Sequence, residues 1–269
     1  MAQEMRYYSG CDVGSTTGKA VIINDNGIVA TSIVPSEIDP EDTANKALEA
    51  ALKQVKDIKR VKDLACLVGT GYGRTEVPFA DINISEISCH AMGAHCCNPK
   101  IKTIIDIGGQ DVKGISLNDD GSVLDFAMND KCAAGTGKFY EAMSRTFRMD
   151  LSQFSDLSLN AKKSIPVTSQ CSVFAESEVI SLFAKKNSPA DIALGIQEAV
   201  ARRCLMLLKR VGIRNDVVMT GGCAKNKGLV KALKSIAKID IVSLSIDPQL
   251  IGAFGAAVLA KKRKNKISE

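Results

Sequence analysis

The chain lacks any apolar run long enough to cross a bilayer. A membrane helix needs roughly 20 apolar residues, whereas the longest run here extends only from Leu250 to Ala260. The N-terminus also lacks the charged start and apolar core of a secretion signal. We therefore expect a soluble, cytoplasmic protein that has no membrane partner.

The chain has nine cysteines but no Cys-x-x-Cys pair, which excludes the commonest pattern of zinc and ferredoxin sites. Without a secretion signal, a disulfide framework is not expected either. Cys11 and Cys66 lie in strand-like runs and Cys204 in a helical run, so we expect small core hydrophobes at these positions. One group looks like a metal site, but its spacing fits no standard zinc frame: Cys89, His90, His95, Cys96 and Cys97.

Segregated charge is also missing. The formal net charge is +5, but acidic and basic residues are interspersed, and the one basic run extends from Lys261 to Lys266. We expect a solvated tail there and no nucleic-acid partner. A complete P-loop is absent too, because neither GSTTGK (Gly14–Lys19) nor GTGK (Gly135–Lys138) has the required spacer and the hydroxyl residue after lysine.

What the chain does contain is one segment that occurs twice. DVGSTTGKAVIINDNG begins at Asp12 and returns as DIGGQDVKGISLNDDG from Asp106. Each copy reads as a strand ending in Asp-x-Gly, a tight turn of small residues and a second strand. The copies are in register, so that they pair Asp12 with Asp106, Gly14 with Gly108, Lys19 with Lys113, Asn24 with Asn118 and Gly27 with Gly121.

The chemistry of this repeat favours phosphate binding. Small residues in the turn leave backbone N–H groups bare, and such groups bind phosphate oxygens. An aspartate at the end of each first strand suits Mg²⁺, which takes one or two carboxylates together with waters and phosphate oxygens. Two such hairpins facing each other would hold a nucleoside triphosphate from both sides. The alternative is a pair of ordinary hairpins left by an ancient duplication.

A third segment, TGGCAKN from Thr220 to Asn226, follows a predicted strand and precedes a predicted helix. Gly221 and Gly222 would let a ribose or a flat ring lie against the backbone, where a side chain would collide. The segment therefore suits the adenosine end of a nucleotide. A plain strand-to-helix turn is the alternative, because two glycines and an asparagine are common in such turns.

Strands alternate with helices along the chain, which predicts an α/β fold with sheets covered on both faces. With 269 residues, two domains are favoured. The duplication divides them into residues 1–98 and 99–269, with the final helix able to pack back on the first domain. Periodicity predicts helices at about 42–56, 85–94, 137–147, 173–186 and 189–211 and from 249 onward, and strands at 28–33, 64–68, 101–106, 217–219 and 239–243.

Two cysteines, Cys132 and Cys171, each stand just before a predicted helix. The N-terminus of a helix stabilises an anion, and a thiolate is a good ligand for a soft metal. Two ligands do not complete a four-thiolate site, but a two-fold dimer that places both pairs on its axis would supply four. Buried structural cysteines are the alternative for both positions.

Seven motifs together resemble the activators of 2-hydroxyacyl-CoA dehydratases. These activators belong to the same ATPase family as the ATP-hydrolysing subunits of benzoyl-CoA reductase and the activators of double-cubane-cluster reductases. The resemblance extends from Gly10 to about Ala260, and MNDKCAAGTG is its most specific part. The motifs are DVGSTTGK, GTGYGR, SCHAMGA, DIGGQDVK, MNDKCAAGTG, FAESEVIS and MTGGCAKN.

The resemblance implies a duplicated actin-like fold, as in sugar kinases and heat-shock chaperone ATPases, with two subdomains and the nucleotide in the cleft. It implies an ATPase coupled to electron transfer: a homodimer with one 4Fe-4S cluster, ligated by Cys132 and Cys171 of each subunit, near helices within residues 132–186. The expected partners are an iron–sulfur dehydratase or reductase and an upstream reductant such as ferredoxin or flavodoxin. An oxygen-sensitive cluster of this kind predicts an anaerobic setting.

The same resemblance assigns roles to single residues. Asp12 and Asp106 would hold Mg²⁺, and Asp106 or Gln110 would orient the attacking water. Glu176 is a further candidate for that water, and the alternative is a carboxylate that complements the helix dipole. Cys223 and Lys225 depart from the family pattern inside the adenosine motif. ATP or ADP would contact Asp12, Gly14, Ser15, Thr16, Thr17, Lys19, Gly108, Gly109, Gln110, Asp111, Gly221, Gly222, Ala224 and Asn226.

Two other classes of protein remain open from the sequence. One is a small-molecule kinase on the same fold, although no further Asp motif supplies its general base. The other is a nucleotide-switched scaffold without redox chemistry. Within the activator class, the partner is a dehydratase, a benzoyl-CoA reductase or a double-cubane-cluster reductase, and the sequence does not specify its substrate.

Overall fold

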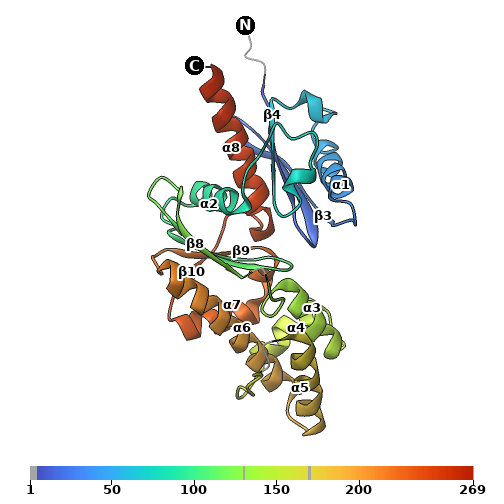
Figure 1. Ribbon diagram of the computed structural model, residues 1–269, viewed down its shortest axis with the longest axis vertical. Coiled ribbons are helices and arrows are strands. Elements are labelled where there is room, and N and C mark those ends of the chain that lie inside the picture. Colours follow the sequence, from blue (N-terminus) through green and yellow to red (C-terminus); the bar gives the residue numbers. More distant parts are fainter. Residues whose placement is uncertain (1–4, 130, 169–170, 269) are drawn as a thin grey trace. The chain divides into compact units, whose positions relative to one another are not determined.

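The computed structural model describes residues 5–129, 131–168 and 171–268 of the chain (Figure 1). The backbone divides into two compact units. The first comprises Met1–Ile101, Leu117–Leu124 and Leu244–Glu269, and the second comprises Lys102–Ser116 and Asp125–Ser243. The sequence-based division kept residues 244–269 with the second half, with the last helix able to pack back. In the structure this segment lies in the first unit, because its helix packs against the central strand there.

The first unit is built on a five-stranded sheet in the order β3-β2-β1-β4-β5. The central strand β1 runs antiparallel to β2 and parallel to β4. Both β1 and β4 are buried along their whole length, as expected for strands covered on two faces. The strands are β1 (Tyr8–Val13), β2 (Thr17–Asn24), β3 (Gly27–Pro35), β4 (Cys66–Thr70) and β5 (Ile82–Asn83).

The second unit contains a sheet of the same plan, in the order β10-β9-β6-β7-β8. Its central strand β6 is antiparallel to β7 and parallel to β9, as β1 is to β2 and β4. The duplication read from the hairpins therefore extends to whole sheets. The strands are β6 (Thr103–Ile107), β7 (Val112–Leu117), β8 (Val123–Asn129), β9 (Val217–Thr220) and β10 (Ile241–Val242).

Three helices cover the first sheet: α1 (Pro40–Leu52), α2 (Glu86–Cys97) and α8 (Ile251–Ser268). The α1 helix begins after Asp39, whose carboxylate accepts the N–H of Glu41, with Pro40 in the first turn. The α8 helix packs against β1, β4 and α2 through a stripe of small residues. That stripe consists of Ala253, Ala256, Ala257 and Ala260, all completely buried.

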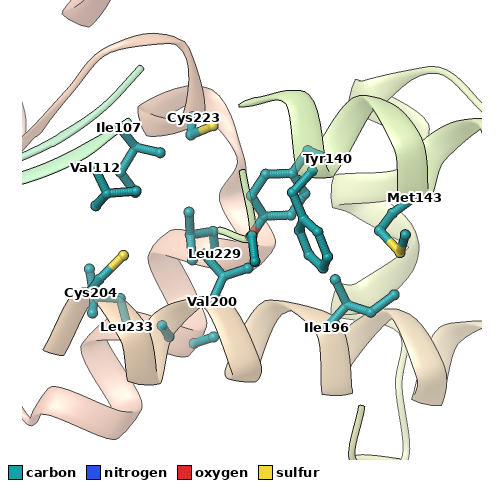
Figure 2. Packing of buried hydrophobic residues seen from close by; sticks show 14 of the residues in the cluster. Ile107, Val112, Tyr140, Met143, Ile196, Val200, Cys204, Cys223, Leu229 and Leu233 are labelled. Carbon is teal, nitrogen blue, oxygen red and sulfur yellow. The ribbon is translucent and has the colours of Figure 1, made fainter. Parts of the chain in front are cut away.

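The helices of the second unit are α3 (Gly137–Thr146), α4 (Leu151–Leu159), α5 (Ser172–Ala184), α6 (Pro189–Val211) and α7 (Lys227–Ala237). Figure 2 shows part of their core, in which Ile196 and Val200 of α6 lie near Tyr140 and Met143 of α3. The α6 helix ends at Gly212, whose φ of 77° is a conformation that glycine adopts without strain. Short 3₁₀ turns lie at Val61–Asp63, Arg74–Glu76, Gly222–Lys225 and Pro248–Leu250.

The α4 helix was not predicted from the sequence. A capping box marks its N-terminus: the Asp150 side chain accepts the N–H of Gln153, and the Gln153 side chain accepts the N–H of Asp150.

Among the described residues, no helix is long and apolar enough to cross a membrane.

Candidate functional site

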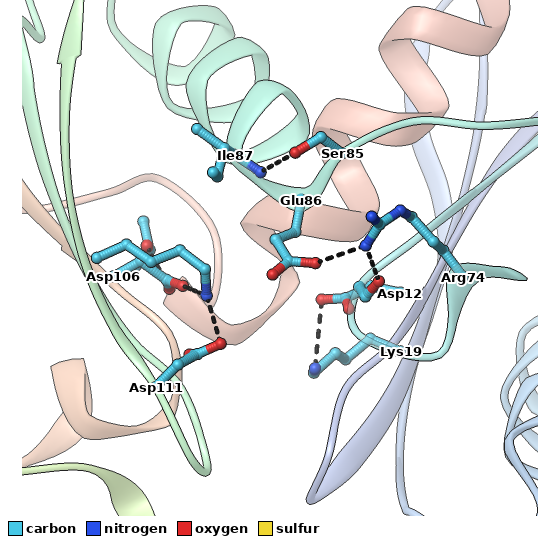
Figure 3. Close-up of polar contacts among 11 residues, drawn as sticks. Asp12, Lys19, Arg74, Ser85, Glu86, Ile87, Asp106 and Asp111 are labelled. Carbon is cyan, nitrogen blue, oxygen red and sulfur yellow. Dashed lines mark hydrogen bonds and ion pairs between the residues drawn. The ribbon is translucent and has the colours of Figure 1, made fainter. Parts of the chain in front are cut away.

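Each repeated hairpin places its aspartate opposite its lysine. Asp12 pairs with Lys19 across β1 and β2, and Asp106 pairs with Lys113 across β6 and β7. The Lys19 Nζ lies 3.2 Å from Asp12 Oδ2, and the Lys113 Nζ lies 3.4 Å from Asp106 Oδ2 (Figure 3). Both aspartates are buried, with 5% and 3% of their surface exposed. Because each buried carboxylate lies beside a cation, its charge is compensated inside the protein.

The second hairpin carries an additional acid. Asp111 Oδ2 lies 2.8 Å from Lys113 Nζ, so this lysine contacts two carboxylates. Asp106 Oδ1 accepts a hydrogen bond of 2.8 Å from the hydroxyl of Thr220 on β9. A carboxylate has roughly four lone-pair sites, so one carboxylate can accept hydrogen bonds and bind a cation at the same time. The oxygen donors therefore fit a hard cation.

The two turns share one backbone hydrogen bond at corresponding positions. The Gly14 N–H donates to the Thr17 carbonyl at 3.1 Å, and the Gly108 N–H donates to the Asp111 carbonyl at 3.0 Å. A Cβ on Gly14 would lie 2.8 Å from Lys19 Nζ and 3.0 Å from the Thr17 carbonyl oxygen, so a side chain would crowd the turn. The rest of the first turn consists of the small residues Ser15 and Thr16. In the second turn, Gly109 is followed by the larger, exposed Gln110.

One oxygen of the first turn points to a ligand. Among the residues that the structure describes, the Thr16 hydroxyl is buried and has no hydrogen-bond partner. A buried hydroxyl without a partner is costly, so such groups normally bind a water, an ion or a ligand. Phosphate oxygens would meet this need, which agrees with the predicted role of the hairpin.

The duplication continues into a feature that the sequence did not reveal. Thr70 lies beside Asp12 in the parallel register of β4 with β1, as Thr220 lies beside Asp106 in the register of β9 with β6. A glycine with positive φ follows each threonine: Gly71 at 90° and Gly221 at 80°. The loop GTGYGR is thus the counterpart of the loop TGGCAK. The two loops share only a Thr-Gly pair, too little to detect from sequence.

Both glycines lie against the carboxylate of the aspartate in their own hairpin. A Cβ on Gly71 would collide with Asp12 Oδ1, and one on Gly221 would lie 3.0 Å from Asp106 Oδ1. In the first unit, Arg74 fixes this arrangement, since its Nη1 donates to the Gly71 carbonyl at 3.0 Å and lies 3.4 Å from Glu86 Oε2 (Figure 3). Counting from the shared Thr-Gly pair, the position of Arg74 corresponds to Ala224 in the second unit.

The predicted adenosine segment forms a strand, a 3₁₀ turn from Gly222 and the start of α7. Asn226 caps α7 by accepting the Leu229 N–H at 3.0 Å, and its amide donates to Gln197 Oε1 at 3.2 Å. Asn226 therefore has a structural role in the helix start. Burial raises the pKa of Cys223 to about 12, so this thiol is a protonated part of the core at neutral pH.

Cys132 and Cys171 are both exposed at the surface of the second unit, which does not support the alternative of buried structural cysteines. Cys132 lies on the segment between β8 and α3, and Cys171 is the N-cap residue of α5. The α3 and α5 helices pack against each other. Asp130 of the MNDKCAAGTG motif and Gln170 lie outside the described residues. Cys171 thus stands at the start of α5, and Cys132 lies on the segment that leads into the neighbouring α3.

Other cysteines are unlike this pair. Burial raises the pKa of Cys11, Cys89 and Cys204 to about 12, so these thiols stay protonated at neutral pH. Cys96 is exposed, on α2 of the first unit. Within the described part of the chain, no group of three or more His, Cys, Asp or Glu side chains could hold a metal ion.

Glu176 lies on the exposed side of α5. Its Oε1 accepts a hydrogen bond of 3.2 Å from the Thr146 hydroxyl at the end of α3, so it links the two helices. Its neighbour Glu178 accepts the N–H of Thr168 at 3.0 Å and holds the segment before α5. These contacts give both glutamates a structural function.

Two sheets with corresponding strand orders, each with a buried Asp–Lys hairpin, define the duplicated α/β fold of the actin-like class. The solved structure of MreB 5 of Spiroplasma citri shares this fold, with a TM-score of 0.52 at 15% identity over 99% of each chain. A family model agrees with the class. The chain belongs to the BadF/BadG/BcrA/BcrD ATPase family, whose model matches residues 9–260.

Relatives from several organisms cover nearly the full chain. An activator of lactoyl-CoA dehydratase from Anaerotignum propionicum is 44% identical over 97% of this chain and 99% of its own. The (R)-2-hydroxyglutaryl-CoA dehydratase activating ATPase of Acidaminococcus fermentans is 42% identical over 97% and 99%. A solved structure, the activator of the 2-hydroxyisocaproyl-CoA dehydratase from Clostridium difficile with bound ADPNP, has a TM-score of 0.90 at 40% identity, covering 97% of both chains.

Proposed function

We propose that this chain is the ATP-hydrolysing activator of an iron–sulfur enzyme, most closely a 2-hydroxyacyl-CoA dehydratase in the cytoplasm of an anaerobe. Two copies of the chain would hold one 4Fe-4S cluster through Cys132 and Cys171 of each. When bound, that cluster would supply one-electron transfer at low potential. A reductant such as ferredoxin or flavodoxin would reload it.

One observation carries this proposal: two thiols are exposed on segments that lead into two neighbouring helices, in the unit that also bears the second Asp–Lys hairpin. Soft thiolates fit an iron–sulfur cluster. One chain alone supplies two of the four thiolates, and its described residues contain no complete metal site. A second copy would complete the set by two-fold symmetry.

The residues of the chain itself would bind and position ATP. Backbone N–H groups of the two turns and the Thr16 hydroxyl would bind phosphate oxygens. Asp12 and Asp106 would hold Mg²⁺ directly or through water, with Lys19 and Lys113 compensating charge. Asp106 or Gln110 would orient the attacking water. The kinase alternative is not favoured, because the relatives above 40% identity are named as dehydratase activators.

Iron content tests this proposal. Protein prepared without oxygen should contain about two iron atoms per chain, as one 4Fe-4S cluster per dimer requires. Cys132→Ser and Cys171→Ser should each abolish iron binding and partner activation. Cys96→Ser is the matched control, because Cys96 is also exposed but lies elsewhere on the chain, and it should leave the iron content unchanged. Colourless, iron-free wild-type protein that still hydrolyses ATP would refute the redox function and leave a nucleotide-switched scaffold.

A further inference from the structure

Two backbone hydrogen bonds join the second phosphate turn to the helix behind Cys132. The Gly137 N–H donates to the Gly108 carbonyl at 2.9 Å, and the Lys138 N–H donates to the Gly109 carbonyl at 2.8 Å. Gly137 and Lys138 are the first two residues of α3. Their N–H groups have no partner inside the helix, as is general for a first turn, so the phosphate turn supplies it.

The planarity of the peptide group gives these contacts a consequence. The Gly108 carbonyl and the Gly109 N–H belong to one rigid plane and point in opposite directions within it. The Gly109 carbonyl and the Gln110 N–H form the next plane. If a phosphate oxygen reorients either N–H group, the carbonyl on the same plane must turn as well. The helix start that is bound to these carbonyls then moves or loses a hydrogen bond.

A stiff turn connects this helix start to Cys132. The Thr136 N–H and hydroxyl both donate to the Ala133 carbonyl, at 3.0 and 2.7 Å. Thr136 and Ala134 are buried, whereas Cys132 at the edge of the turn is exposed. The Cys132 carbonyl also accepts a hydrogen bond of 3.5 Å from Asn129 at the end of β8. Because the turn is packed and hydrogen-bonded, a movement of Gly137 displaces the Cys132 backbone.

The first unit holds its own turn in another way. There the Ser36 hydroxyl donates to the Gly14 carbonyl at 2.8 Å, and the Ser36 N–H donates to the Thr16 carbonyl at 3.0 Å. Ser36 directly follows β3, and no cysteine lies between it and α1. In the second unit the corresponding connection carries Cys132. In each unit the phosphate turn is thus hydrogen-bonded to the connection that follows the third strand, by different groups, and only in the second unit does that connection carry a thiol.

We infer that Gly137 and Lys138 are positioning residues, whose backbone N–H groups transmit the state of the nucleotide from the turn Gly108–Gln110 to Cys132. The inference rests on the proposed function in one respect, since it gives Cys132 the role of a cluster ligand. The route lies within a single unit of one chain. It needs neither the cluster nor a second copy in order to operate.

Thiol alkylation tests this route in the full-length chain without a cluster. The rate at which iodoacetamide modifies Cys132, divided by the rate for the exposed Cys96, is measured by mass spectrometry without nucleotide, with ADP and with a non-hydrolysable ATP analogue. We expect this ratio to differ by about fivefold between nucleotide states, the factor that one hydrogen bond contributes. An identical ratio in all three conditions would overturn the inference.

A matched pair of variants at Lys138 locates the effect. Lys138→Pro removes the N–H that donates to Gly109, at a helix position where proline is tolerated. Lys138→Ala removes the same side chain and keeps the N–H. The alanine variant should respond to nucleotide as wild type does, whereas the proline variant should bind the analogue and lose most of the response. Equal responses in the two variants would overturn the inference.

A third variant decides the matter if the proline variant does not fold. Thr136→Val removes the hydroxyl bond to Ala133 and keeps the shape of the side chain. It should lower the Cys132 response while nucleotide affinity is unchanged, and a full response would contradict the inference. The outcome is separable from the proposed function: iron-free wild-type protein refutes that function alone, whereas a normal cluster with an unresponsive Cys132 refutes the route alone.

Discussion

At the scale of single residues, Arg74 distinguishes the two Thr-Gly loops, because the corresponding position in the second loop is Ala224. It bridges Glu86 at the start of α2 and the Gly71 carbonyl behind Asp12. Its side chain is 38% exposed, so its ion pair contributes at most about 1 kcal/mol to the free energy of unfolding. Its larger effect should be on the position of Asp12, because Gly71 is in direct contact with that carboxylate.

We therefore expect Arg74→Ala to lower the rate of ATP hydrolysis about tenfold, which corresponds to about 1.4 kcal/mol of activation free energy. The melting temperature should change little. Arg74→Lys keeps the charge but not the planar fork, and should restore part of kcat. The measurement is steady-state hydrolysis with purified variants beside a thermal melt. Unchanged kcat in Arg74→Ala would show that Gly71 is held by its own backbone alone.

At this scale, the sequence identified the repeated aspartates and lysines but not the residues that contact them. The two aspartates and the two lysines stood out because both copies keep them at the same spacing, whereas the contact between the aspartate and the lysine of each hairpin is seen only in the structure. Arg74 could not be recognised, because its relation to Asp12 depends on the parallel register of β4 with β1, which joins residues distant in sequence. The structural contacts of Asn226 and Glu176 were missed for the same reason.

At the scale of secondary-structure elements, glycines set how closely the helices of the first unit approach one another. A Cβ on Gly255 of α8 would collide with the Cys89 carbonyl and lie 2.7 Å from the Gly93 N of α2. This close contact requires a glycine on each helix, Gly255 on α8 and Gly93 on α2. Helix periodicity predicted the existence of α2 and α8, but only the packed structure shows why their glycines are required.

Gly255→Ala tests this close approach, since two effects oppose each other in it. Helix propensity alone would stabilise the variant by about 1 kcal/mol, whereas overpacking costs about 1–3 kcal/mol. We expect packing to dominate and the free energy of unfolding to fall, as measured by urea denaturation. Gly114→Ala is the control, because a Cβ at Gly114 would lie 3.4 Å from its nearest atom, which is an ordinary contact. The free energy of unfolding should therefore fall less in Gly114→Ala than in Gly255→Ala. A stabilised Gly255→Ala protein would contradict the packing argument.

At the scale of the whole molecule, the C-terminal helix belongs to the unit in which the chain begins. Its small residues cover β1 and β4 and form one core with Tyr8, Val21, Val68 and Cys89. The sequence predicted two similar halves from the duplication, and the sheets have that form. It left the place of the last helix open, because an alanine-rich helix gives no signal of which distant strand it will cover.

Truncation shows whether α8 completes the first unit. A chain ending at Ser243 loses the helix and exposes the apolar face of β1 and β4, so we expect the first unit to unfold while the second stays folded. Hydrogen exchange should then be fast in peptides of β1 and slow in those of β6. A chain ending at Ala260 keeps every buried alanine of α8 and should retain protection in both. If the truncation at Ser243 removes protection equally from both sheets, the two units fold as one cooperative body. If β1 keeps its protection, α8 is dispensable for that core.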